Sequence, residues 1–376
     1  MRRIISIGNH PRVDGLRINF RDRELDLVRG ANVTVWMPKK GYVGGEVQGL
    51  ALGLPATMAG DITGFGVGIF GVGAEENFRG IGVAGVGLGA GGSTRGIMLG
   101  GIGVGAGSDV RGIAVGGIGA GAGGDARGLM VGGVGAAAGG SVRGITVGGV
   151  GAGAGGNARG ILVGGIGAGA GGDARGIIAG GIGAGVGGNM RGLAASAIGV
   201  GVGGNARGIL FGGIGAGAGG SIRGLSVGGI GVGAGGSIRG VSVAGVGVGS
   251  GGDITGLSVA AVGVGSAGTL RWVSVGGLGV GAPRIDGFAA GLMVGAERTR
   301  ALVIAPAHFR TAVGGQMNGV TVSSVNYIPG YQRGLTIGLV NYTERLRGVQ
   351  VGVVNIVSER PWPFKAIPVI NVGRDR

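Results

Sequence analysis

The stretch Arg111-Gly112-Ile113-Ala114-Val115-Gly116-Gly117-Ile118-Gly119-Ala120-Gly121-Ala122-Gly123-Gly124-Asp125-Ala126 decides the fold, because close copies of it recur every sixteen residues. An exact period of this kind is the signature of one structural unit copied many times. Thr63 and Thr255 hold two places of the register in which the other copies carry an arginine. The arginines of this row are Arg79, Arg95, Arg111, Arg127, Arg143, Arg159, Arg175, Arg191, Arg207, Arg223, Arg239 and Arg271.

Composition limits the fold class to an ordered β protein. The 376 residues include 106 glycines and only 9 prolines, without the strict every-third-residue glycine of collagen. Each glycine inside a helix costs roughly 0.5–1 kcal/mol relative to alanine, so glycine at nearly every second place argues against helices. Ile, Val, Leu and Ala at regular places separate the chain from polar, disordered sequences. We therefore expect an all-β protein.

The apolar side chains of one repeat fall into two sets. One set consists of the odd-numbered Ile113 and Val115, and the other of the even-numbered Ile118, Ala120 and Ala122. In an unbroken strand the two sets would face opposite sides. A turn or bulge at Gly116-Gly117 would bring all five to one side. We expect these five side chains to point into the core.

Two arrangements of such strands are compatible with the repeat. In a glycine-rich β-solenoid, each sixteen-residue coil stacks on the next at about 4.8 Å in parallel sheets. In an antiparallel β-meander or barrel, the Gly-Gly pair is a hairpin tip, and repulsion between arginines favours this alternative. Later repeats favour the solenoid, because Leu339 stands where the hairpin would need its second glycine. We predict the solenoid.

Sequence character divides the chain into three parts. Residues 1–47 alternate apolar and charged side chains and are predicted to be an N-terminal cap, which a solenoid needs. Residues 48–283 form the regular sixteen-residue repeat region. Residues 284–376 hold divergent repeats of fourteen to fifteen residues, and the repeat pattern stops at Pro361-Trp362-Pro363-Phe364. We predict that residues 284–376 contain the C-terminal cap.

The last repeats carry a resemblance to a known group. The segments Arg333-Gly334-Leu335-Thr336-Ile337-Gly338-Leu339-Val340-Asn341 and Arg347-Gly348-Val349-Gln350-Val351-Gly352-Val353-Val354-Asn355 resemble the units of uncharacterised bacterial surface-repeat proteins. Those proteins are often exported or lipoproteins. The resemblance implies a cell-envelope or extracellular setting and no catalytic activity. Residues 4–10 are too short and polar for the apolar core of a signal peptide, so none is expected in this chain, despite its charged start Met1-Arg2-Arg3.

The arginine row is the one candidate binding site. The formal net charge is +15, and a stacked row of guanidinium groups would attract polyanions such as lipopolysaccharide or acidic polysaccharide. Nucleic acid is an unlikely partner, since Phe211 and Trp272 are the only aromatic residues between Phe78 and Phe288. In the competing interpretation the arginines hydrogen-bond turn carbonyls and keep the surface soluble. Outward glycines would also form flat faces suited to self-association.

No pattern predicts catalysis, a cofactor or a metal. The chain has no cysteine and two histidines, His10 and His308, far apart in sequence. Ser226 lies in a Gly-x-Ser-x-Gly match, but the position varies freely between repeats and lacks a nearby histidine. The place held by Asp125 carries Asp, Asn or Ser elsewhere, which is typical of residues that cap turns. The apolar stretches are too short for a transmembrane helix.

Together these features predict a non-enzymatic structural or surface repeat protein of the bacterial cell envelope. The alternative is a binding protein for anionic polymers or lipid head groups that acts through the stacked arginine row. A second alternative is a membrane-associated β-barrel.

Overall fold

The structure is a computed structural model that describes residues 4–39, 41 and 43–373, so Met1-Arg2-Arg3 lies outside the described residues. It divides into two compact units, residues 1–188 and 189–376, each described here by itself. In both units the described residues form strands and turns without a helix. The predicted all-β solenoid is confirmed.

Unit 1 alternates long and short strands. β1 (Ile5–Ile7) pairs with the first long strand. The long strands are β2 (Arg12–Asn19), β3 (Leu27–Thr34), β4 (Glu46–Gly53), β6 (Asp61–Gly68), β8 (Phe78–Ala84), β10 (Thr94–Gly100), β12 (Val110–Gly116), β14 (Ala126–Gly132), β16 (Val142–Gly148), β18 (Ala158–Gly164) and β20 (Ala174–Gly180). The short strands are β5 (Ala56–Ala59), β7 (Gly71–Ala74), β9 (Gly87–Ala90), β11 (Gly103–Ala106), β13 (Gly119–Ala122), β15 (Gly135–Ala138), β17 (Gly151–Ala154), β19 (Gly167–Ala170) and β21 (Gly183–Val186).

Unit 2 begins with the same alternation and ends in longer strands. The long strands are β22 (Met190–Ser196), β24 (Ala206–Gly212), β26 (Ile222–Gly228), β28 (Ile238–Ala244), β30 (Ile254–Ala260) and β32 (Thr269–Gly276), and the short ones are β23 (Gly199–Val202), β25 (Gly215–Ala218), β27 (Gly231–Ala234), β29 (Gly247–Ser250) and β31 (Gly263–Ser266). β33 (Gly279–Ala290), β34 (Met293–Ile337) and β35 (Val340–Val357) follow, and β36 (Ala366–Gly373) lies antiparallel to β35.

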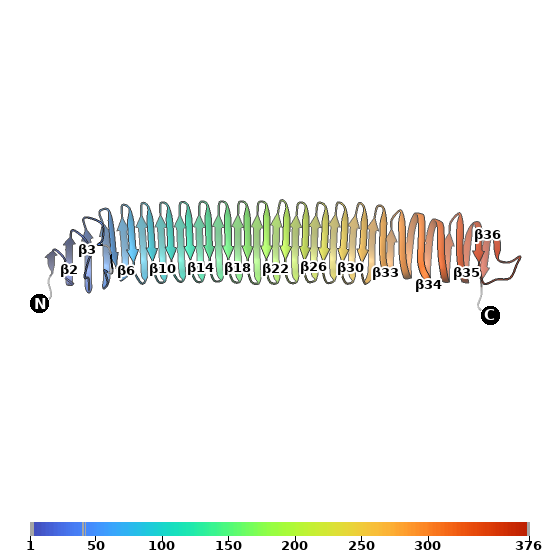
Figure 1. Cartoon of the computed structure of the whole chain (residues 1–376), viewed down its shortest axis with the longest axis horizontal. Helices are drawn as coiled ribbons and strands as arrows, with labels where there is room; N and C mark the ends of the chain where they lie inside the picture. Colours follow the sequence, from blue (N-terminus) through green and yellow to red (C-terminus); the bar gives the residue numbers. More distant parts are fainter. Residues whose placement is uncertain (1–3, 40, 42, 374–376) are drawn as a thin grey trace. The chain divides into compact units, whose positions relative to one another are not determined.

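Identical positions of successive coils pair in parallel within each unit. Arg111 of β12 lies opposite Arg95 of β10 and Arg127 of β14, so the register advances by one sixteen-residue repeat per strand. The short strands pair among themselves in the same way, as β13 does with β11 and β15. Figure 1 shows the strands side by side within each unit. Parallel pairing rules out the antiparallel hairpins considered from the sequence. The boundaries at residues 47 and 283 stay predictions.

The prediction of which side chains face inward was wrong for three of the five. Ala120 and Ala122 are buried, but Ile113 and Ile118 are 37% and 53% exposed, and Val115 lies on the outer side of β12 between two buried positions. The residue that seemed freely variable, Ala114, is fully buried. Its counterparts Met130, Leu162 and Ser226 are buried as well. The variable position is therefore the core.

The turn at Gly116-Gly117 does not change the parity of the inward residues, and this causes the reversal. Ala114 and Gly116 before the turn and Ala120 and Ala122 after it are buried with the same parity, so that Arg111, Ile113 and Val115 all face outward. Gly112, between Arg111 and Ile113, has φ of 127°. A Cβ on Gly112 would lie 2.0 Å from the carbonyl oxygen of Gly96 in the neighbouring strand. The same place is glycine at positive φ in the other regular coils of both units except at Trp272. Only glycine can adopt this positive φ and also leave room for the neighbouring carbonyl oxygen without strain.

The core is thin, and the first two of the three inward positions on each regular long strand compensate in volume. In β8 the first position is Phe78 and the second is Gly82, whose Cβ would come 2.9 Å from the Phe78 ring. In β18 the order is reversed, with Ala158 first and Leu162 second. Ile222 and Ser226 follow the first pattern in unit 2, where the buried Ser226 hydroxyl lies 2.8 Å from that of Ser242. Close packing at constant volume explains why large residues do not occur at both positions.

Polar networks are buried in the first coils of unit 1 and the last coils of unit 2. Asp22 accepts hydrogen bonds from Arg17, Asn32 and Thr34, and burial lowers the pKa of the Arg17 guanidinium against the opposing charge of Asp22. In unit 2, Asn326 donates to Asn341 and Asn341 donates to Asn355, each at 2.7 Å. Paired amides stacked from coil to coil satisfy one another and pin the register.

The volume compensation predicts non-additive mutations in β18. Leu162→Ala should destabilise the protein by about 2–5 kcal/mol through a cavity, and Ala158→Leu by about 1–3 kcal/mol through overpacking. The double variant should lose less than the sum, with a coupling of about 0.5–3 kcal/mol. Denaturant unfolding of the four proteins measures this coupling. Strict additivity would contradict the compensation.

The two kinds of glycine predict opposite effects of the same substitution. Gly128→Ala places a Cβ 2.1 Å from the Gly112 carbonyl oxygen at φ of 120°, so it should destabilise by roughly 1–3 kcal/mol from backbone strain, with the clash in addition. Gly121→Ala meets no atom within 4 Å and should be neutral or stabilising by about 0.4–1 kcal/mol. Thermal unfolding of the two variants measures the difference. If both substitutions changed the stability equally, the division of the glycines into two kinds would be wrong.

Candidate functional site

Each unit carries one column of stacked arginines on the outer side of its long strands. We call these the arginine columns, and they consist of Arg79, Arg95, Arg111, Arg127, Arg143, Arg159 and Arg175 in unit 1 and Arg191, Arg207, Arg223, Arg239 and Arg271 in unit 2. Thr255 lies between Arg239 and Arg271. Arg111 is half-buried and the other arginines are exposed. The structure thus brings the predicted row together within each unit.

The turn residues before the arginines tie one coil to the next. Asp109 Oδ1 accepts a hydrogen bond from the backbone N of Asp125 at 2.9 Å, and Asp125 Oδ1 accepts from the N of Ser141 at 2.8 Å. That backbone bond, together with Arg111, lowers the pKa of Asp109, although partial desolvation raises it. The predicted turn-capping role is confirmed, with the bonded amide in the neighbouring coil.

Acidic residues neutralise only part of the arginine columns. Arg111 lies 3.3 Å from Asp109, Arg127 lies 3.8 Å from Asp125, and Arg271 lies 3.9 Å from Asp253. At the turns before Arg143, Arg159, Arg207, Arg223 and Arg239 the sequence has Ser or Asn instead. Two guanidinium groups about 4.8 Å apart repel by roughly 0.9 kcal/mol in water before salt screening. A bound anion would relieve that repulsion.

Aliphatic side chains stand beside the arginines on the same sheet face. Three columns run parallel to the arginine column, two on the long strands and one at the turn that follows them; we call them the aliphatic face. In unit 1 this face includes Ile113, Ile145 and Ile177, then Leu99, Val115 and Val147, then Ile118, Val150 and Ile182 at the turns. Most are between a third and a half exposed. Exposed apolar surface of this extent indicates an interaction site.

Trp272 is the least expected residue of this surface. It lies opposite Gly256 and Gly287, at the place that is glycine in the neighbouring strands, and adopts φ of 83°. Its side chain is 71% exposed next to Arg271. A bulky residue at positive φ is strained by about 1–3 kcal/mol, and strain of this kind concentrates at functional positions.

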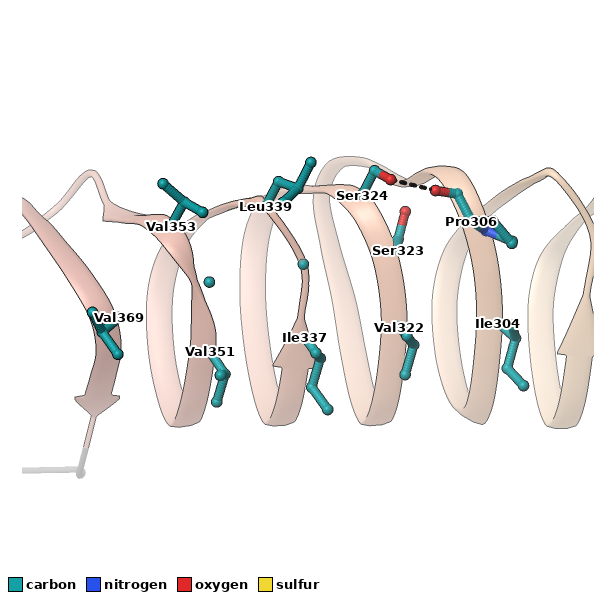
Figure 2. Close-up of a pocket in the computed structure, with 12 residues that line it drawn as sticks. Ile304, Pro306, Val322, Ser323, Ser324, Ile337, Leu339, Val351, Val353 and Val369 are labelled. Atoms are coloured by element: carbon teal, nitrogen blue, oxygen red, sulfur yellow. Dashed lines mark hydrogen bonds between the residues drawn. The ribbon is translucent and has the colours of Figure 1, made fainter.

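An apolar groove opens on the last coils of unit 2. Figure 2 shows its two walls, one made of Ile304, Val322, Ile337, Val351 and Val369 and the other of Pro306, Ser324, Leu339 and Val353. Gly338 and Gly352 also line the cavity, which measures about 710 Å³. They follow Ile337 and Val351 at the place where the preceding coils have the buried residues Ala305 and Ser323.

The outer face of the short strands has the opposite character. In β13 and β17 the outward residues are Gly119, Gly121, Gly151 and Gly153, which line a shallow trough of about 550 Å³. A Cβ on any of these four would meet no atom closer than 3.8 Å. Their flatness is not imposed by contacts within the chain, and the predicted self-association through this face stays a prediction.

Sequence reasoning found the arginine columns and missed the rest of the surface. The isoleucines of the aliphatic face were assigned to the core, because the change of parity expected at Gly116-Gly117 does not occur. The groove had one available signal, namely the shortening from sixteen to fourteen residues per coil between Gly334 and Gly348. Trp272 was recognised only as a break in the pattern.

Comparison with known proteins adds no family. No family model matches the chain, and neither a curated protein nor a solved structure shows significant similarity to it. Over the described residues, no helix is long and apolar enough to cross a membrane, and no group of three metal-binding side chains comes together.

Proposed function

We propose that the protein is a non-enzymatic surface repeat protein of the bacterial cell envelope whose aliphatic face and arginine columns bind an anionic lipid surface. The observation that carries the proposal is the parallel course of exposed apolar and cationic columns on one face of each unit. The sequence resemblance of the last repeats to bacterial surface proteins supports the envelope setting.

The chemistry of the two kinds of column favours lipid over a soluble polyanion. An acidic polysaccharide or another hydrophilic polymer would use the guanidinium groups but would leave Ile113, Ile145 and their neighbours in water. A lipid surface satisfies both, since apolar side chains enter the head-group boundary while cations stay with the phosphates. Trp272 fits the same setting, because the indole ring prefers membrane interfaces.

Charge removal within unit 1 tests the electrostatic part of the proposal. Each arginine near an anionic bilayer contributes about 1 kcal/mol, so changing Arg111, Arg143 and Arg175 together to Gln should weaken binding roughly a hundredfold at low salt. Co-sedimentation with vesicles that contain anionic lipid measures the affinity. The matched control changes Arg21, Arg23 and Lys39, exposed and outside the strands, to Gln. If both triple variants bind equally, only net charge matters and the site is wrong.

Trp272 gives a test in which stability and binding separate. Trp272→Gly should leave the free energy of unfolding unchanged or raise it by about 1 kcal/mol, because it relieves the positive φ. The same variant should bind anionic vesicles more weakly, while Trp362→Leu, at a 79% exposed side chain in the loop before β36, should not. Thermal unfolding and co-sedimentation provide the two readouts. A destabilised Trp272→Gly with unchanged binding would assign Trp272 a packing role instead.

A further inference from the structure

We propose that the apolar groove of unit 2 binds one long-chain fatty-acid anion, with its hydrocarbon chain between the two walls and its carboxylate at the neighbouring arginines. This goes beyond binding to a lipid surface, because the ligand is a single amphiphile taken from solution. The groove and its flanking charges lie wholly within residues 300–369.

The groove has the length and shape of an extended chain. The five side chains of its lower wall in Figure 2 follow one another from Ile304 in β34 through Val351 in β35 to Val369 in β36, and four spacings between neighbouring runs of the chain amount to about 19 Å. A zigzag of ~1.5 Å bonds advances roughly 1.25 Å per carbon, so the walls accommodate roughly fifteen carbons. The volume of about 710 Å³ lies within the range of small-molecule sites, about 300–1,000 Å³.

The lining favours hydrocarbon over peptide. The two hydroxyl groups in the walls are already bonded, since Ser323 donates to the Val325 carbonyl at 2.9 Å and Ser324 donates to that of Pro306 at 2.6 Å. The groove lies on a sheet face, where the backbone groups are used in the strand ladder. A peptide would bring its own amides into an apolar space without partners, at a cost in free energy, whereas an acyl chain brings none.

Charge complementarity favours an anionic head group and disfavours a second copy of the chain. Arg300, Arg333 and Arg347 are exposed and stand four residues before Ile304, Ile337 and Val351 on the same strands, roughly 13 Å away. The carboxyl end of the chain crosses Leu302, Leu335 or Val349 toward this row, so that about ten carbons of a sixteen-carbon chain remain between the walls. Arginine binds carboxylates with two parallel hydrogen bonds. In a dimer formed through this groove, the arginine rows of the two copies would approach each other, and their like charges would repel.

The end of the groove is strained. Val369 adopts φ of 68° and is 67% exposed, at the place where the pairing of β36 with β35 shifts register between Gly352 and Asn355. A β-branched residue rarely adopts this conformation. The Val369 side chain lines the groove, and its exposure shows that burial does not offset the strain. A ligand against that side chain would supply the missing contact.

The test uses the whole chain and a photoactivatable sixteen-carbon fatty acid below its micelle-forming concentration, with the labelled residues mapped by mass spectrometry. Labelling should concentrate on residues 304–369. Leu339→Asn with Val353→Asn, at side chains that are 59% and 64% exposed, should reduce it about tenfold or more, because the upper wall becomes polar. The methyl ester of the same probe should label less, since it lacks the charge.

The matched control is Leu278→Asn, a 53% exposed turn residue of unit 2 outside the groove, which should leave labelling unchanged. If the double variant has lost its β-sheet circular dichroism, Val353→Asn alone replaces it. The proposed fatty-acid site is wrong if labelling is spread evenly along the chain or if the double variant is labelled as strongly as the original protein. If labelling of the groove fails while the protein still binds vesicles, the fatty-acid site is wrong and the proposed function is unaffected. If the groove is labelled while the protein does not bind vesicles, only the proposed function is wrong.

Discussion

One glycine per coil, held at positive φ against the carbonyl group of its counterpart in the neighbouring strand, is the constraint that the regular coils share. Gly112 has φ of 127°, and a Cβ there would lie 2.0 Å from the carbonyl oxygen of Gly96. The alternation of side chains continues through this residue, since Val110 and Ala114 point inward while Arg111 and Ile113 face outward. Apart from Trp272, the regular coils keep glycine at this place because each glycine leaves no room for a Cβ on the next.

The thin core follows from that geometry. Each short strand contributes two small inward residues, such as Ala120 and Ala122, and the long strand has room for one large side chain rather than two. Hydrophobic burial per coil is consequently modest, and stability has to come from the parallel ladder that links each coil to both neighbours. The side-chain oxygens of Asp109 and Asp125 add a second ladder at the turn, which fixes the register without using core volume.

The sequence predicts the coil, its length and its turn residues, because these depend on the period and on local preferences of Asp, Asn, Ser and glycine. It does not predict the direction of the side chains. Ile113 and Ala114 differ by one position, and the larger residue is the more reasonable core candidate when only hydrophobicity is considered. The Gly116-Gly117 turn keeps the parity of the inward residues, and a glycine-rich sequence does not distinguish such a turn from one that changes it. The groove depends on how the residues that line it, among them Gly338 and Gly352, come together from several coils.

The outer surface carries features that folding alone does not require. The core would be the same if Ile113 and Ile145 were Thr, a strand former of similar shape that suits solvent better. Trp272 and Val369 keep positive φ values that glycine would adopt without strain. Both lie on the outer side of unit 2, and neither gains burial in return. Where residues raise the free energy of the isolated chain and leave its core unchanged, an interaction outside the chain would compensate. On β12, β16 and β20 of unit 1 the arginines and the exposed aliphatic residues lie on the same outer side of the strands, so one partner with an apolar part and an anionic part would satisfy both kinds of side chain.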